Sequence, residues 1–192
     1  MPDAIRSHWP LRLIALLARA NRAIAIVCGV VLLGAMVLIL LEIVMRQVAG
    51  RGIGGADEIS GYVMAGVAAW GFSYALVERA HVRIDVVTGR LSAPGRAAFD
   101  LVALAALTGV AATVTGYGWR VLGTTLARGA RANTPLETPL WIPQAIWLSG
   151  WAWLTLVAGL LVLATAALIG QGRWREAQDA AGIAAEAGGD TP

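Results

Sequence analysis

Four long stretches without a charged side chain divide the sequence, and they limit the possible folds more than any other feature. They are residues 23–41, 59–77, 101–119 and 141–170. Helical residues rise about 1.5 Å each, so stretches of this length nearly cover or exceed the ~30 Å hydrocarbon core of a bilayer. Hydrocarbon offers the backbone no hydrogen-bond partners, so a segment that crosses it must be helical. We therefore predict an all-α integral membrane protein with four transmembrane helices.

The composition agrees with this prediction and excludes several other classes. The chain is 58% hydrophobic and only 14% charged, whereas a soluble domain carries roughly 25% charged residues. This balance excludes a disordered chain, a collagen and a typical cytosolic enzyme, and the single Cys28 excludes a disulfide scaffold. The net charge is +3 and every basic residue is arginine. With so apolar a chain we expect membrane lipid, and no nucleic acid, as a partner.

The N-terminal residues mix arginines with apolar side chains. Leu13 and Leu17 lie among Arg12 and Arg19, a pattern that predicts an amphipathic interfacial helix, although a simple basic flank explains it equally well. The first apolar stretch exceeds the ~7–15 residues of a signal-peptide core, so we expect it to be retained as a span. The predicted domains are a basic amphipathic segment (1–22), a transmembrane domain (23–170) with spans at about 23–45, 59–77, 101–119 and 141–169, and a flexible cytoplasmic tail (171–192).

The distribution of arginine predicts the orientation of the chain. With four spans, the N-terminal flank, the second loop and the C-terminal tail lie on one side, and they carry ten arginines. The first and third loops lie on the other side and carry five. Positively charged loops are retained in the cytoplasm. We therefore expect both termini to be cytoplasmic and the first and third loops to face outward.

The sequence contains few residues that could catalyse a reaction or bind a metal or cofactor. The two histidines, His8 and His81, lie outside the apolar stretches, so a haem with two imidazole ligands inside the membrane is not expected. The sequence contains no zinc-ligand cluster and no phosphate-binding loop. We predict no catalytic residue, no metal site and no cofactor. The best candidate for an acid within a span is Glu42, which either pairs with Arg46 one turn later or is the essential acid of a small, self-contained, homo-oligomeric transporter.

Small and aromatic residues within the spans predict helix packing. Small side chains let helices approach closely in lipid, and a tryptophan in mid-membrane usually packs against protein. The contact is expected either within this bundle or with a partner subunit. The candidate residues are Gly61, Ala65, Trp70, Gly109, Trp147 and Trp151.

Three motif elements occur in order along the chain. The first is Arg46 at the end of the first span, followed by a short loop and the acids Asp57 and Glu58. The second is a span rich in small and aromatic residues that ends in a His-x-x-x-Asp segment, and the third is a Thr-Pro-x-x-x-Pro entry to the last span. The corresponding residues are His81, Arg83 and Asp85 in the second element, and Thr134, Pro135, Pro139 and Pro143 in and after the third.

With these elements the sequence resembles, over residues 23–169, the DctQ-like small permease subunit of tripartite ATP-independent periplasmic (TRAP) transporters. One departure is the glycine-rich first loop, residues 50–55, where relatives often carry an aromatic before the acids. The resemblance implies a non-catalytic scaffold in the bacterial inner membrane. Its implied partners are a large permease, which carries substrate and sodium, and a periplasmic solute-binding protein. Uptake of an organic acid or similar small solute by symport is implied as well.

The resemblance also implies roles for individual residues. Glu58, His81, Arg83 and Asp85 are expected to position loops and helix ends, and Pro135, Pro139 and Pro143 to shape the turn into the fourth span. Proline is tolerated there because the first-turn N–H groups of a helix have no partner within the helix. We also hypothesise that the arginines of the third loop help the binding protein to dock. These are Arg120, Arg128 and Arg131.

Overall fold

The computed structural model describes residues 9–78 and 92–181, and these residues are almost entirely helical. Four of the helices are long and apolar enough to cross a membrane, which confirms the predicted all-α architecture with four spans. The remaining helix is short and follows the last span. In chain order they are α1 (Trp9–Ala49), α2 (Ala56–Val77), α4 (Ala93–Arg128), α5 (Trp141–Gly170) and α6 (Trp174–Ala181).

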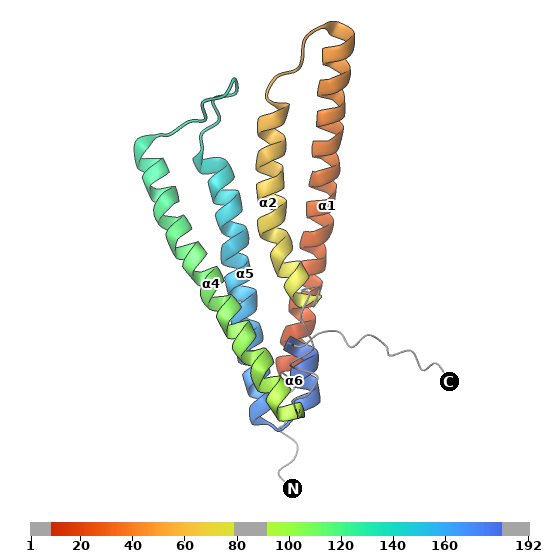
Figure 1. Cartoon of the computed structure of the whole chain (residues 1–192), viewed down its shortest axis with the longest axis vertical. Helices are drawn as coiled ribbons and strands as arrows, with labels where there is room; N and C mark the ends of the chain where they lie inside the picture. The colour runs from red at the N-terminus through yellow and green to blue at the C-terminus, as the bar shows by residue number, and fades with distance from the viewer. Residues whose placement is uncertain (1–8, 79–91, 182–192) are drawn as a thin grey trace, which may run out of the picture.

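The four long helices form two antiparallel hairpins, α1–α2 and α4–α5 (Figure 1). Helix α5 packs against α4, α2 and α1, so it lies at the centre of the bundle. The hairpins come together at the end where α1 begins and α6 lies. The loop between α1 and α2 and the loop between α4 and α5 lie together at the opposite end. We call these the first loop (residues 50–55) and the third loop (residues 129–140).

Helix α1 differs from its prediction, because it is one continuous helix of 41 residues. At 1.5 Å per residue it is about 60 Å long, twice the hydrocarbon thickness. Its first turns do not form a separate interfacial helix. Instead Leu17 is buried in a cluster with Leu104 and Val157, and Leu13 packs against that cluster. The predicted amphipathic segment is therefore not confirmed, since Leu17 is buried against other helices while Leu11 and Leu16 are exposed. Residues 1–8 lie outside the described part of the chain.

The end of the bundle near α6 has a second small core. Ala97 of α4, Leu168 of α5 and Ala177 of α6 are fully buried together. Gln178 Nε2 donates a hydrogen bond of 2.9 Å to the carbonyl oxygen of Ala93 at the start of α4. Part of the predicted tail is thus a helix that packs on the bundle, while residues 182–192 are not among those described.

Aromatic and amide side chains connect three helices in the middle of the bundle. Asn21 of α1 is fully buried, and its Oδ1 accepts a hydrogen bond of 3.2 Å from Trp153 Nε1 of α5. The Trp153 ring stacks on Trp70 of α2, with centroids 6.4 Å apart. Trp70 Nε1 in turn donates to the carbonyl oxygen of Ile146, at 3.2 Å. Trp70 therefore packs within this bundle, which was one of the two alternatives for it.

The closest approach of α2 and α5 occurs at Gly150. A Cβ at this position would lie 2.8 Å from both the backbone carbon and the Cβ of Ala69, and 2.9 Å from Trp70 Cδ1. Two of these three atoms cannot move without shifting α2. The absence of a side chain at Gly150 therefore permits the contact between the two hairpins.

We predict that Gly150→Ala destabilises the protein by about 1–3 kcal/mol, because the added methyl group overpacks this contact. Gly109→Ala in α4 is the matched control, since nothing lies within 4 Å of a Cβ there and alanine favours a helix by about 1 kcal/mol over glycine. Thermal unfolding of the two variants in detergent measures the difference. Equal stability of the variants would contradict the close approach of α2 and α5.

Candidate functional site

Glu42 holds the first loop in place from the last turns of α1. Its Oε2 accepts hydrogen bonds from the backbone N–H groups of Ile53, at 2.7 Å, and Gly54, at 3.3 Å. Its Oε1 accepts a bond of 2.8 Å from the Arg46 guanidinium, so the predicted i,i+4 pair is confirmed. Glu42 is only 6% exposed, whereas the Arg46 side chain is 66% exposed. The carboxylate thus supplies partners to non-helical backbone at the membrane edge, where unpaired N–H groups are costly.

Two glycines allow the first loop to take this shape. A Cβ on Gly52 would lie 2.0 Å from Glu42 Oε1, so any side chain there would displace the carboxylate. Gly55, just before α2, has φ of 80° and would place a Cβ 2.4 Å from Leu136 Cδ1 of the third loop. A side chain at Gly52 or Gly55 would therefore disturb a close contact of the first loop.

The third loop is a short hairpin. The N–H of Ala132 bonds to the carbonyl oxygen of Thr138 at 2.9 Å, and the N–H of Leu140 to that of Ala130 at 3.1 Å. Its tip is a turn closed by a bond of 3.0 Å from the Glu137 N–H to the Thr134 carbonyl oxygen. Pro135 occupies the second position of this turn, where its fixed φ is favourable.

Glu58 joins the two loops. Its Oε1 accepts a hydrogen bond of 2.7 Å from the Tyr62 hydroxyl one turn along α2. The side chains of Thr134 and Thr138, which flank the tip of the third-loop hairpin, lie beside the same carboxylate. Leu136 lies directly over Gly55. The acid of the first motif element and the threonines of the third, which are far apart in the sequence, are therefore neighbours in space.

The other residues of the motif elements have simpler positions. Asp57 is exposed in the first turn of α2, where a carboxylate is favourable at the positive end of the helix dipole. Pro139 forms an isolated bridge with Arg131. Pro143 is the third residue of α5, where the missing N–H costs nothing. His81, Arg83 and Asp85 lie in residues 79–91, outside the described part of the chain.

The three arginines proposed for docking differ in their surroundings. The Arg120 guanidinium lies over the ring of Tyr117, 5.4 Å from its centroid. Arg131 donates a bond of 3.1 Å to the carbonyl oxygen of Glu137, a residue with the unusual φ of 45°. Arg128 ends α4 with its side chain exposed. Arg131 is thus partly engaged in shaping the loop, although all three side chains are exposed.

The packing candidates separate into two groups. Trp151 packs against Trp147 and against Phe72 of α2, with ring centroids 5.9 Å and 5.5 Å apart, so these rings fill the contact between hairpins. In contrast, Gly61, Ala65 and Gly109 face away from the bundle: Ala65 is exposed, and a Cβ on either glycine would meet nothing within 4 Å.

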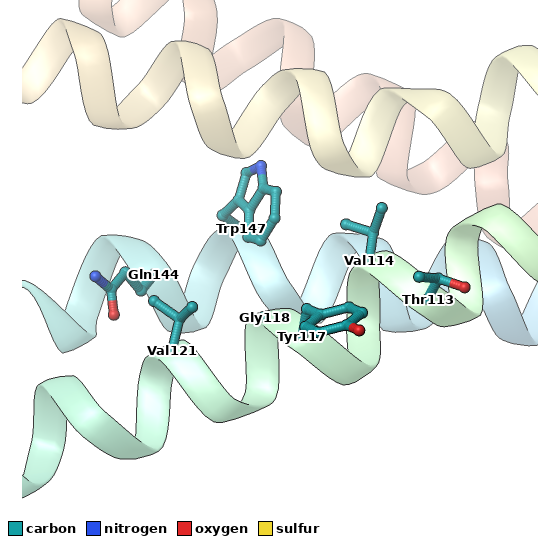
Figure 2. Close-up of a pocket in the computed structure, with 7 residues that line it drawn as sticks. All are labelled: Thr113, Val114, Tyr117, Gly118, Val121, Gln144 and Trp147. Atoms are coloured by element: carbon teal, nitrogen blue, oxygen red, sulfur yellow. The ribbon is translucent and has the colours of Figure 1, made fainter.

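Two apolar clefts open on the sides of the bundle. One, of about 500 Å³, lies between α1 and α2 and is lined by Val27, Cys28, Tyr62 and Trp70, among others. The other, of about 390 Å³, lies between α4 and α5 (Figure 2). Both are lined almost entirely by carbon.

Sequence reasoning missed two of the polar contacts. It paired Glu42 with Arg46 but did not find the capture of the first-loop N–H groups, although the alternating glycines of residues 50–55 were a visible signal of close backbone approach. It did not single out Asn21, whose amide carries no recognisable pattern. In residues 9–78 and 92–181 no three His, Cys, Asp or Glu side chains gather closely enough to hold a metal ion.

Comparison with known protein families found one match. The model described as "Tripartite ATP-independent periplasmic transporters, DctQ component" matches residues 35–167. This range contains the end of α1, the whole of α2 and α4, most of α5, and both the first and the third loop. The comparisons with curated proteins and with solved structures found no match.

We predict that Gly55→Ala loosens the third loop more than Gly54→Ala does. Both glycines have a positive φ, 80° and 84°, so the backbone strain of the two variants is similar. Only at Gly55 would the new methyl group displace Leu136, because nothing lies within 4 Å of a Cβ on Gly54. Hydrogen exchange at the N–H groups of Ala132 and Glu137 measures the effect, and we expect it to be about tenfold faster in Gly55→Ala, a loss of about 1.4 kcal/mol of local stability. Equal exchange in the two variants would show that the loops are not coupled.

Proposed function

Because this chain belongs to the DctQ component family of tripartite ATP-independent periplasmic transporters, we propose that it is a fixed, non-catalytic scaffold for the large permease. Membership of the family makes it the small, multi-pass membrane subunit of such a transporter, which works with a large permease and a solute-binding protein. The proposal adds that the complete system takes up an organic acid or similar small solute, that uptake depends on the binding protein, and that it is a symport driven by sodium.

The engagement of Glu42 carries the proposal. A self-contained transporter needs an acid in its spans that can release its partners when cargo or a proton binds. Glu42 is the acid that this alternative requires, and both its oxygens are occupied, by Arg46 and by two backbone N–H groups of the first loop. Its contacts are those of a structural residue, which supports the scaffold over the self-contained transporter.

Uneven burial supports a large partner within the membrane. In the most apolar part of α1 only 6% of the residues are buried, compared with 39% in that of α5. Helix α1 presents large side chains outward along its length, among them Val30, Leu33 and Leu40. We propose that the large permease covers α1 and the outward face of α2 that carries Gly61 and Ala65, since small residues allow a neighbouring helix to approach.

The proposed location is the bacterial inner membrane with both termini in the cytoplasm. The twofold excess of arginine on the side of the termini supports this orientation. The first and third loops then face the periplasm, where a solute-binding protein arrives. The segment 171–192 would be cytoplasmic, and lipid would surround the surfaces that the large permease leaves uncovered.

Reconstitution into vesicles tests the proposal. We expect no uptake by this chain alone, and sodium-dependent uptake when the large permease and the loaded binding protein are added. Glu42→Gln should keep most of the uptake of the complete system, because an amide oxygen still accepts the N–H of Ile53. Uptake by the isolated chain that Glu42→Gln abolishes would establish the self-contained transporter and overturn the scaffold.

Charge reversal of Arg128 tests the docking of the binding protein. We predict that Arg128→Glu raises the apparent KM for the loaded binding protein about threefold to fivefold, as expected for one exposed ion pair. The increase should diminish with added salt, which screens exposed charges. Arg175→Glu is the matched control, because Arg175 is also exposed but lies in α6 at the opposite end. An unchanged KM in Arg128→Glu would count against docking at the third loop.

A further inference from the structure

The cleft between α4 and α5 has the dimensions and chemistry of a site for a single lipid chain. Its volume is about 390 Å³, and it is lined by Thr113, Val114, Tyr117, Gly118 and Val121 of α4 and by Gln144 and Trp147 of α5. Figure 2 shows the lining residues spread along the two helices, with Gln144 and Val121 at one end and Thr113 and Val114 at the other. A helix is about 10–12 Å across with its side chains, too wide to enter such a space. A hydrocarbon chain is narrow enough.

A cation, Arg120, lies beside a residue that lines this cleft. Arg120 is the first charged residue after the apolar stretch of residues 101–119, so it lies where headgroups begin. Its guanidinium is positioned over the Tyr117 ring, 5.4 Å from the centroid, and Tyr117 lines the cleft. A cation over an aromatic face is held in place, and guanidinium is the side-chain group best suited to bind phosphate.

A hydrogen-bond acceptor without a partner lies at the same end. The side-chain oxygen of Gln144 is buried and has no hydrogen-bond partner among the described residues. Gln144 is the fourth residue of α5, in its first turn, so it too lies at the headgroup level. A buried acceptor left unpaired costs free energy, and a donor arriving from a bound molecule would remove this cost.

We propose that this cleft binds one glycerophospholipid with a hydrogen-bond-donating headgroup. An acyl chain fills the apolar part between α4 and α5, the phosphate accepts hydrogen bonds from Arg120, and the headgroup donates to Gln144 Oε1. Phosphatidylethanolamine, through its ammonium, and phosphatidylglycerol, through its hydroxyls, both have this chemistry. Phosphatidylcholine has the same phosphate and chains but no donor. The site is independent of the surface that we propose for the large permease.

Native mass spectrometry of the full chain in mild detergent, with each of the three lipids added in turn, tests the site. We expect one molecule of phosphatidylethanolamine or phosphatidylglycerol to be retained, and phosphatidylcholine to bind about fivefold more weakly because Gln144 stays unpaired. Arg120→Gln should weaken the binding of the lipid about tenfold, since it removes a charge-assisted hydrogen bond to the phosphate. Val114→Phe should reduce retention similarly by filling the cleft.

Two control variants match these changes outside the cleft. Arg128→Gln removes another exposed arginine of α4, and Val102→Phe enlarges an exposed valine of the same helix; both should retain lipid like the unaltered chain. Because Arg120 is exposed, Arg120→Gln is expected to fold even if Val114→Phe does not. Equal retention by Arg120→Gln, or equal affinity for phosphatidylcholine and phosphatidylethanolamine, would overturn the proposal. So would a photoreactive acyl chain that labels α1 and α2 but not Tyr117 or Trp147.

Discussion

Hydrocarbon leaves the peptide backbone no partner outside its own helix, and the rest of this structure follows from that constraint. Within residues 9–78 and 92–181, α1 and α2 are joined at one end of the bundle, and so are α4 and α5. At the loop end, carboxylates provide hydrogen-bond partners that the helix backbone provides elsewhere. Glu42 provides acceptors for the N–H groups of Ile53 and Gly54, and Glu58 interacts with the threonines of the third loop. Glu42 and Glu58, which the sequence alone could suggest as functional acids, thus provide hydrogen-bond acceptors where the chain leaves its helices.

The two hairpins are joined by contacts that differ in kind along the bundle. Leu17 of α1 packs with Leu104 of α4 and Val157 of α5, so close packing of apolar side chains joins the hairpins there. Between α2 and α5, the hairpins are joined by the close approach at Gly150 and by the stacked rings of Trp70 and Trp153. Near the loops, Leu136 packs over Gly55. Contacts at three levels therefore hold the two hairpins together.

Much of the fold could be predicted from hydropathy, and the differences have a common physical reason. The second and fourth spans, predicted as 59–77 and 141–169, are helices Ala56–Val77 and Trp141–Gly170. The first and third spans extend well beyond the predicted 23–45 and 101–119, because hydropathy reports where a helix contacts lipid and not where it continues into water. The individual residues of the site could be predicted, but the contacts among them could not. Nothing in the spacing of Glu58 and Thr138 indicates that they meet, since their proximity depends on how α2 and α5 pack.

The Glu42 carboxylate, near the end of α1, finds its hydrogen-bond partners within this chain. In a subunit that binds and releases ions, an acid in mid-membrane must exchange partners during each cycle, and its surroundings must leave space for that exchange. Here the Glu42 carboxylate lies against Gly52 of the first loop. A methyl group on that glycine would displace the carboxylate. Because this carboxylate accepts hydrogen bonds from Arg46 and from the N–H groups of the first loop, a change of partners would release that loop. The buried Glu42 carboxylate thus fixes the first loop to α1, whereas the apolar surface of α1 itself is left largely exposed by the rest of this chain.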